Sequence, residues 1–301
     1  MAPPPSPSHP DAARAGAVAR VRAWYADHAR PLPWREADAG PWAVMVSEFM
    51  LQQTPVARVL PVWHAWLERW PNPTALAAEE PGEAVRAWGR LGYPRRAQRL
   101  HAAASAIRDE HGGAVPSDLD ALRALPGVGE YTAAAIASFG FGRRHVVLDT
   151  NVRRVLARVE TGREFAPAGL TRAERERATA WVPDEPAAAA AWAAASMELG
   201  ALVCTAERPR CGACPVSGDC AWLAAGRPSW DGPPRTGQAY AGTDRQCRGV
   251  LLGALREADA GVRPDQLLAL WPADAAQAER ALASLLADGL VRSDGGGGLR
   301  L

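Results

Sequence analysis

Apolar residues recur at helical spacing along most of this chain and rarely alternate with polar ones. Within 15–29, for example, Val18, Val21, Trp24 and Tyr25 fall on one stripe of a helix. Because little of the chain shows a period of two before residue 240, we expect an all-α body. Pro- and Gly-rich breaks separate the further helices that the pattern predicts, at 42–51, 55–69, 83–90, 95–110, 118–125, 130–140, 151–160, 171–181 and 186–202.

The two ends of the chain have a different composition. Residues 1–14 are rich in Pro, Ala and Ser and predict a disordered tail, and residues 225–246 have the composition of a linker. In 247–301, three short helical segments precede LVRSDGGGGLRL, which suits two short strands around a Gly-rich turn. This order predicts a small winged-helix-like module. The segment from residue 225 onward has no net charge, which favours a packing role over a strong contact with phosphates.

Composition limits the classes of partner. With 301 residues, of which 48% are hydrophobic, the chain can form two domains and a small third one. No apolar run approaches the roughly 20 residues that span a bilayer, and the chain opens without an apolar signal segment. We therefore expect no membrane partner and a reducing cytoplasm. The net charge is +1, so any nucleic-acid surface must be local. The sequence contains no lysine, so no lysine can form a Schiff base.

Four cysteines stand close together, in the spacing C-x6-C-x2-C-x5-C. They are Cys204, Cys211, Cys214 and Cys220. Four thiolates can ligate one zinc ion or one iron–sulfur cluster. Zinc ribbons usually carry two C-x2-C pairs, and this chain has one, so the spacing favours a 4Fe-4S cluster over zinc. Two disulfides are the third alternative, which a reducing compartment disfavours.

The segment LPGVGEY, residues 125–131, lies between two predicted helices and forms a second motif. Its glycines allow a tight turn, and helix, Gly-x-Gly turn and helix together predict a helix-hairpin-helix. The backbone around Gly127, Val128 and Gly129 would then present N–H groups to a DNA phosphate. A simple turn between two helices is the alternative.

Two carboxylates are candidates for chemistry. Asp149 precedes a predicted helix, where Asp is a preferred N-cap, and a carboxylate there can also stabilise a sugar cation. Glu48 has Val44, Met45 and Leu51 as helical neighbours. Burial among them would raise its pKa and make it a general acid. Alternatively, Glu48 lies at the edge of the apolar stripe and reaches water.

Arginines form three local clusters that fit a DNA-binding face, although arginines of this kind more often solvate helix surfaces. The clusters are Arg86, Arg90, Arg95, Arg96 and Arg99, then Arg143 and Arg144, then Arg153, Arg154 and Arg158.

The motifs SEFMLQQT, LPGVGEYTAAAI, VVLDTNVRRVLARV and MELGALVC, followed by the cysteine quartet, resemble the adenine DNA glycosylases of the MutY type. These belong to the helix-hairpin-helix superfamily that includes endonuclease III. The resemblance covers residues 15–224. It implies two lobes: a helical barrel over about 35–145, and the N-terminal helix joined to the cluster-bearing segment 146–224. It also implies excision of adenine that is mispaired with 8-oxoguanine or guanine in double-stranded DNA.

The resemblance implies a role for each matching residue. Glu48 would protonate adenine at N7, and Asp149 would stabilise the oxocarbenium-like sugar. We expect solvation and helix-start N–H groups to keep Asp149 ionised. Tyr131 and Asn151 match residues around this centre. Those that match the substrate-contacting positions are Trp34 as a pocket wall, Glu198 as the acid that binds the exocyclic amine, and Gln53, Thr54 and Tyr93, which enter the base stack.

Tyr131 stands where bifunctional relatives carry a lysine, so we expect a monofunctional glycosylase. Pro94 replaces the second tyrosine of the usual GLGYY, and Thr150 and Arg153 also depart from the family's pattern. The segment 247–301 is too short for the Nudix-like domain that helps relatives to recognise 8-oxoguanine. We expect a monomer that associates with the nucleoid. The alternatives are a glycosylase for mismatched pyrimidines, a non-catalytic iron–sulfur DNA-binding regulator and an electron-transfer protein.

Overall fold

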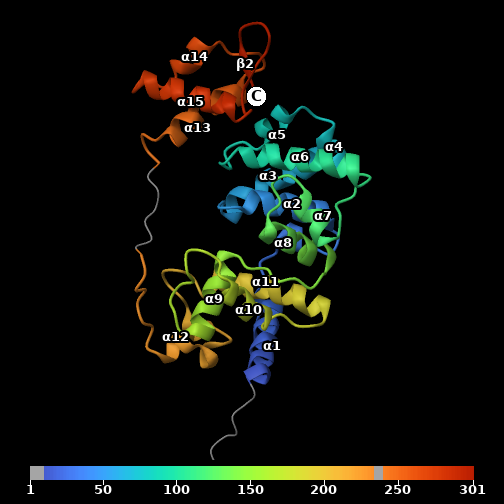
Figure 1. The fold of residues 1–301 in the computed structure, drawn as a ribbon, viewed down its shortest axis with the longest axis vertical. Helices are drawn as coiled ribbons and strands as arrows, with labels where there is room; N and C mark the ends of the chain where they lie inside the picture. The colour runs from blue at the N-terminus through green and yellow to red at the C-terminus, as the bar shows by residue number, and fades with distance from the viewer. Residues whose placement is uncertain (1–9, 234–239) are drawn as a thin grey trace, which may run out of the picture. The chain divides into compact units, whose positions relative to one another are not determined.

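A computed structural model describes residues 10–233 and 240–301. The chain divides into two compact units, one made of the N-terminal segment to Pro41 with Gly129–Pro233, and the other of Trp42–Val128 with the C-terminal segment to Leu301. Figure 1 shows that helices are the main elements of the described chain, with short strands only near the C-terminus. This confirms the predicted all-α class. Across the described ranges, no helix combines the length and apolarity that crossing a membrane requires.

The first unit is built around a long central helix, α11, which packs against α1, α8 and α9. Its core joins Val21 of α1, Val155 of α9 and Trp192 of α11, all buried. The helices of this unit are α1 (Pro10–His28), η1 (Pro33–Arg35), α8 (Glu130–Phe141), α9 (Thr150–Thr161), α10 (Arg172–Thr179), α11 (Pro186–Leu202), η2 (Cys211–Ala213), η3 (Ser217–Asp219) and α12 (Ala221–Ala224).

Tryptophans organise the helical core of the second unit. Trp66 packs edge-to-face on Trp70 and Trp88, with ring centroids 4.6 and 5.5 Å apart. The indole N–H of Trp63 donates to the carbonyl oxygen of Ala43 at 3.0 Å, which ties α3 to α2. These helices are α2 (Gly40–Leu51), α3 (Val56–Arg69), α4 (Pro73–Ala77), α5 (Pro81–Ala87), α6 (Arg95–Glu110) and α7 (Leu119–Ala124).

The C-terminal segment belongs to this second unit. It consists of α13 (Asp244–Glu257), α14 (Pro264–Leu268), α15 (Ala275–Ala287) and an antiparallel pair of strands, β1 (Arg292–Ser293) and β2 (Leu299–Arg300). Val262 adds an isolated bridge to β2. The order of three helices and a two-stranded hairpin is the one the sequence predicts for the winged-helix-like module.

The C-terminal segment is bonded to α5 and α6 by specific polar contacts. The Gln98 side-chain amide donates to the carbonyl oxygen of Gly289 at 2.6 Å, and Arg292 pairs with Glu80 at 2.7 Å. Gly82 of α5 lets Leu301 approach this helix closely, because a Cβ on residue 82 would lie 2.5 Å from the carbonyl oxygen of Leu301.

Several boundaries differ from the sequence expectations. Helix α1 begins at Pro10, inside the stretch expected to be a disordered tail, and α13 begins at Asp244, inside the expected linker. The helix α4 was not predicted, because five residues are too few to show a helical period. The N-cap of α7 is Asp118, whose carboxylate accepts from Asp120 N and Ala121 N. Residues 1–9 and 234–239 lie outside the described ranges.

Candidate active site and cysteine centre

Glu48 lies in the last turns of α2, with a side chain that is only 7% exposed. Its helical neighbours Val44, Met45 and Phe49 are also buried. The alternative in which Glu48 reaches water at the edge of the stripe is therefore wrong. The Glu48 carboxyl group therefore belongs to the buried interior of the second unit.

The chain turns sharply after α2, and a second sharp turn precedes α6. Gln53 in the first turn and Tyr93 in the second adopt positive φ values of 55° and 49°. Both side chains are exposed, Tyr93 at 47%. Thr54 differs, because it is buried and its hydroxyl lies 3.3 Å from the carbonyl oxygen of Leu91. Of the three residues matched to the base stack, Gln53 and Tyr93 thus present side chains at the surface.

The Gly-x-Gly turn lies where the chain passes from one unit to the other. Gly127 has a φ of +78°, and a Cβ there would lie 2.6 Å from the Cβ of Arg99, so this position requires glycine. Gly129 is the N-cap of α8, and a Cβ built on it would meet no atom within 4 Å. Val128 between them is buried. The backbone at Gly129 is accordingly open at the start of a 12-residue helix.

Asp149 is the N-cap of α9, as its position before a predicted helix suggests. Its Oδ1 accepts from Val152 N at 2.7 Å, and its Oδ2 accepts from the Asn151 amide at 2.6 Å. Burial raises the pKa of the Asp149 carboxyl, and these two hydrogen bonds oppose that shift. Of the two effects expected to keep Asp149 ionised, the helix-start N–H group of Val152 is present, whereas desolvation by burial opposes ionisation.

A hydrogen-bonded chain connects Asp149 to the cysteine-bearing loop. Asn151 accepts from Arg154 at 2.8 Å, and the same guanidinium donates to the carbonyl oxygen of Cys204 at 2.7 Å. Gly200 lets α11 approach this chain, since a Cβ there would lie 2.6 Å from the Cβ of Asn151. The glycine of MELG is therefore explained by the packing of α11 on α9.

Glu198 is fully buried on α11 and is held by two arginines, Arg30 and Arg35, that are not among the predicted site residues. Arg30 donates two side-chain hydrogen bonds to it, both at 2.7 Å, and Arg35 donates a third at 2.9 Å. Burial raises the pKa of the Glu198 carboxyl, but the hydrogen bonds of Arg30 and Arg35 outweigh it and lower the pKa to about 2. The signal in the sequence was the pair of arginines that brackets the buried Trp34 in RPLPWR.

Tyr131 lies in the first turn of α8 and packs against a buried cluster formed by Ala134, Ala135, Val147 and Ala193. Val147 is two residues before Asp149. Tyr131, Asp149, Asn151, Trp34 and Glu198 therefore all belong to the first unit, whereas Glu48, Gln53, Thr54 and Tyr93 belong to the second.

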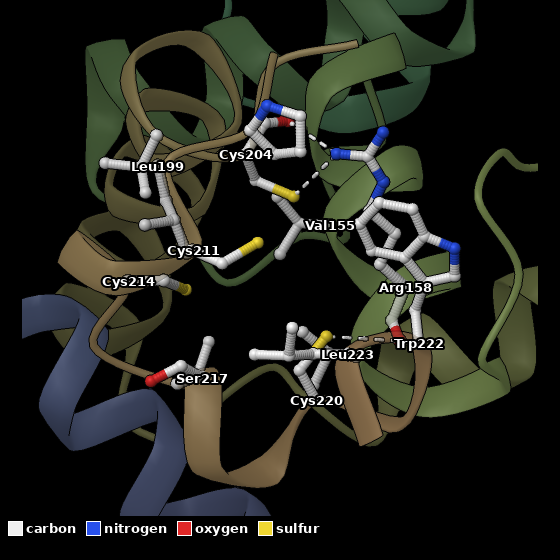
Figure 2. A pocket seen from close by; sticks show the side chains of 14 residues that line it. Val155, Arg158, Leu199, Cys204, Cys211, Cys214, Ser217, Cys220, Trp222 and Leu223 are labelled. Carbon is white, nitrogen blue, oxygen red and sulfur yellow. Dashed lines mark hydrogen bonds between the residues drawn. The ribbon is translucent and has the colours of Figure 1, made fainter. Parts of the chain in front are cut away.

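The four cysteines line one cavity. Figure 2 shows the sulfur atoms of Cys204, Cys211, Cys214 and Cys220 facing a shared space that apolar side chains enclose. Burial, together with the nearby thiols of Cys204, Cys211 and Cys220, raises the pKa of the Cys214 thiol to about 11. Four cysteine sulfurs around one cavity are a donor set that fits a thiophilic metal centre. Among the described residues, no group of three or more His, Cys, Asp or Glu meets the geometry of a metal-ion site.

Arg158 of α9 forms one wall of this cavity. Its side chain is 1% exposed, and Nη1 lies 3.3 Å from the Cys204 sulfur and donates to the carbonyl oxygen of Thr205 at 2.8 Å. The guanidinium also stacks on Trp222, with its carbon 4.4 Å from the ring centroid (Figure 2). A buried cation thus stands beside the first cysteine of the quartet.

The predicted arginine clusters serve the fold more than an open DNA face. Arg96 and Arg158 are buried, and Arg153 pairs with Glu174 at 2.6 Å. Arg86 donates to the carbonyl oxygen of Leu255 at 3.2 Å. The buried Arg96 and Arg158 are therefore neither DNA-facing nor solvated, and Arg86 and Arg153 bond to the fold.

Comparison with known proteins places the chain in a family. Residues 46–180 match the model of the HhH-GPD superfamily base excision DNA repair proteins. The adenine DNA glycosylase of Mycobacterium tuberculosis is 53% identical over 269 residues, which cover 89% of this chain and 88% of the relative. The chain belongs to the adenine DNA glycosylases. The corresponding protein of Mycolicibacterium smegmatis is 51% identical over 275 residues, which cover 91% of this chain and 92% of that relative.

The fold of this adenine DNA glycosylase also resembles a solved structure of a thermostable thymine-DNA glycosylase, with a TM-score of 0.63 and 24% identity. The match covers 70% of this chain and 97% of the other. Membership of the family confirms the predicted helix-hairpin-helix glycosylase fold, and it confirms a DNA-repair enzyme that binds DNA and removes adenine. The alternatives of a non-catalytic regulator and an electron-transfer protein are wrong. Membership of this family is consistent with an enzyme that holds an iron–sulfur cluster.

Proposed function

We propose that this adenine DNA glycosylase excises adenine from A:8-oxoguanine and A:G mispairs, with Glu48 as the general acid. The observation that carries this assignment is the burial of the Glu48 carboxyl group on α2. Adenine is a poor leaving group until a ring nitrogen is protonated. A buried carboxylic acid retains the proton that this step consumes.

In the proposed reaction, the Glu48 carboxyl group transfers its proton to N7 of the flipped adenine. The N-glycosidic bond then breaks, its electron pair leaves with the neutral base, and the deoxyribose becomes oxocarbenium-like. The Asp149 carboxylate, held by Val152 N and the Asn151 amide, would stabilise that positive charge. Addition of water to the sugar carbon completes the hydrolysis and returns one proton to Glu48.

The adenine itself would be recognised by the first unit. Trp34 supplies a buried aromatic wall, and Glu198 lies within a cage formed by Arg30 and Arg35. Because Arg30 and Arg35 lower its pKa, Glu198 would be a carboxylate, which can accept from the exocyclic amine. Recognition of that amine would distinguish adenine from thymine.

The four cysteines would hold a 4Fe-4S cluster, since they line one cavity with apolar walls. A bound cluster would supply four covalent links that fix the loop from Cys204 to Cys220 in one conformation. No proton or bond of the excision step passes through it. The role assigned to these cysteines is therefore structural.

A monofunctional enzyme is supported by the side chains available at the hairpin. The chain has no lysine amine to form a Schiff base with the sugar, and the hydroxyl of Tyr131 cannot form one. The runner-up activity is removal of a mismatched pyrimidine. Glu48 argues against it, since thymine and cytosine have no N7 to protonate. A monomer suits this proposal, because both candidate carboxylates come from one chain.

Glu48→Gln tests the assignment, because glutamine keeps the shape of the side chain and cannot donate that proton. Wild type and variant are compared in single turnovers on duplexes that contain A opposite 8-oxoguanine, A opposite G, or T opposite G. We expect cleavage at A after alkali in the first two, reduced by at least about a thousandfold in the variant. Release of adenine by the variant at the wild-type rate would refute the proposal. The same duplexes without alkali should remain uncut.

A further inference from the structure

Arg96 is buried beneath the turn that follows the Glu48 helix. Its side chain extends from the first turn of α6 and is 6% exposed. One guanidinium group bonds to five oxygen atoms from two separate turns. Nη1 donates to the carbonyl oxygens of Phe49 (2.9 Å), Met50 (2.9 Å) and Gln52 (2.6 Å), and Nη2 donates to Thr54 Oγ1 (3.0 Å) and to the carbonyl oxygen of Gly92 (3.0 Å).

Two of these acceptors directly precede residues with strained backbones. The carbonyl of Gln52 precedes Gln53, and the carbonyl of Gly92 precedes Tyr93. Gln53 and Tyr93 have φ values of 55° and 49°, a region that side chains other than glycine rarely adopt. Within 10–233 and 240–301, Arg227 is the only other non-glycine residue with positive φ. One rigid, planar group thus holds the two strained turns together.

The two strained residues are the ones that present side chains at this surface. Tyr93 is 47% exposed, and the Arg96 guanidinium carbon lies 5.5 Å from the centroid of its ring. Base stacking favours closure of the gap that a flipped base leaves, so a side chain that fills this gap must be held rigidly. A backbone locked in a sparsely populated conformation gives such stiffness, provided that the surrounding structure maintains it.

Arg96 also caps the C-terminal end of the helix that carries Glu48. Phe49 and Met50 lie in the last turn of α2, where carbonyl oxygens lack partners within the helix and a positive charge is favourable. Arg96 therefore fixes the end of the Glu48 helix and both strained turns from one point.

We propose that Arg96 is a positioning residue that locks Gln53 and Tyr93 into a rigid two-point wedge, which opens the duplex beside the target adenine. This inference rests on the proposed function, in which adenine leaves the stack before it is excised. Arg96 itself touches neither the base nor the sugar. Its effect should therefore depend on how much unstacking the substrate still requires.

The test is Arg96→Lys, which keeps the positive charge but offers a single nitrogen that cannot span both turns. Excision in single turnovers is compared on two duplexes with A opposite 8-oxoguanine, one fully paired and one with mismatches on both sides of the target. We expect a loss of about tenfold on the paired duplex and of less than about threefold on the mismatched one. Arg108→Lys is the matched control on the same helix, since Arg108 bonds to the carbonyl oxygen of Ala77 and to Asp109 at the surface. It should excise at the wild-type rate from both duplexes.

Thr54→Val is a milder second variant, because it removes one acceptor of Arg96. It should excise adenine from the paired duplex at about a third of the wild-type rate, and its loss on the mismatched duplex should be smaller. It decides the outcome if Arg96→Lys does not fold. Equal losses on the two duplexes for either variant would overturn the wedge assignment and leave Arg96 as a residue of general stability. Failure of the wild type to release adenine would refute the proposed function instead. In that case, fluorescence of 2-aminopurine beside the target still tests the wedge, because Arg96→Lys should reduce the unstacking signal relative to the wild type.

Discussion

Glu198 combines complete burial with full negative charge, which only its two arginine partners make possible. The pKa of its carboxyl group is lowered from 4.5 to about 2, which corresponds to ~3 kcal/mol of stability at neutral pH. Because the folded-state pKa lies below the unfolded one, this contribution is present above pH 4.5 and disappears as the pH falls towards 2. The ion pair therefore supports the first unit as well as the proposed adenine pocket.

Glu198→Gln should lower the free energy of unfolding by ~3 kcal/mol at pH 7, because Arg30 and Arg35 lose their anionic partner. The difference between variant and wild type should shrink between pH 4.5 and pH 2, where Glu198 of the wild type gains a proton. Denaturant unfolding at a series of pH values measures this difference, and any acid-induced change in the cysteine centre affects both proteins alike. A difference that stays constant over that range would contradict the assigned ion pair.

At the scale of single elements, two helices were predicted with their observed bounds: the expected 95–110 and 186–202 coincide with α6 and α11. What the sequence could not show is which arginines turn inward. A polar side chain on a helix normally reaches water. The acceptors of Arg96 and Arg158 are instead backbone carbonyls of distant turns. Every residue carries a backbone carbonyl, so the residue types do not show which carbonyls accept from an arginine. Buried and solvated arginines therefore could not be distinguished from the sequence.

The element that carries Arg158 is therefore also a support for the cysteine loop. Arg158→Met should destabilise the protein by about 2–4 kcal/mol, because the carbonyl oxygens of Glu164, Thr205 and Ala206 lose their donor. The loop between Cys204 and Cys211 should become sensitive to protease, and the ratio of iron to protein after purification should fall. Arg163→Met serves as the control, since Arg163 is half exposed and stacks on Trp230 at 5.5 Å. Unchanged iron content and protease resistance in Arg158→Met would refute this support.

At the scale of the whole molecule, the C-terminal segment is not an appendage but part of the second unit, and Gly82 offers a direct test of that integration. Replacing glycine by alanine inside a helix normally stabilises a protein by up to ~1 kcal/mol. Here the new Cβ would lie 2.5 Å from the carbonyl oxygen of Leu301, so Gly82→Ala should instead lower the melting temperature and the hydrogen-exchange protection of α5 and α13. Removal of Leu301 from the Gly82→Ala variant relieves the clash and should restore part of both. If Gly82→Ala were more stable than the wild type, then the C-terminus would not be held against α5 in solution.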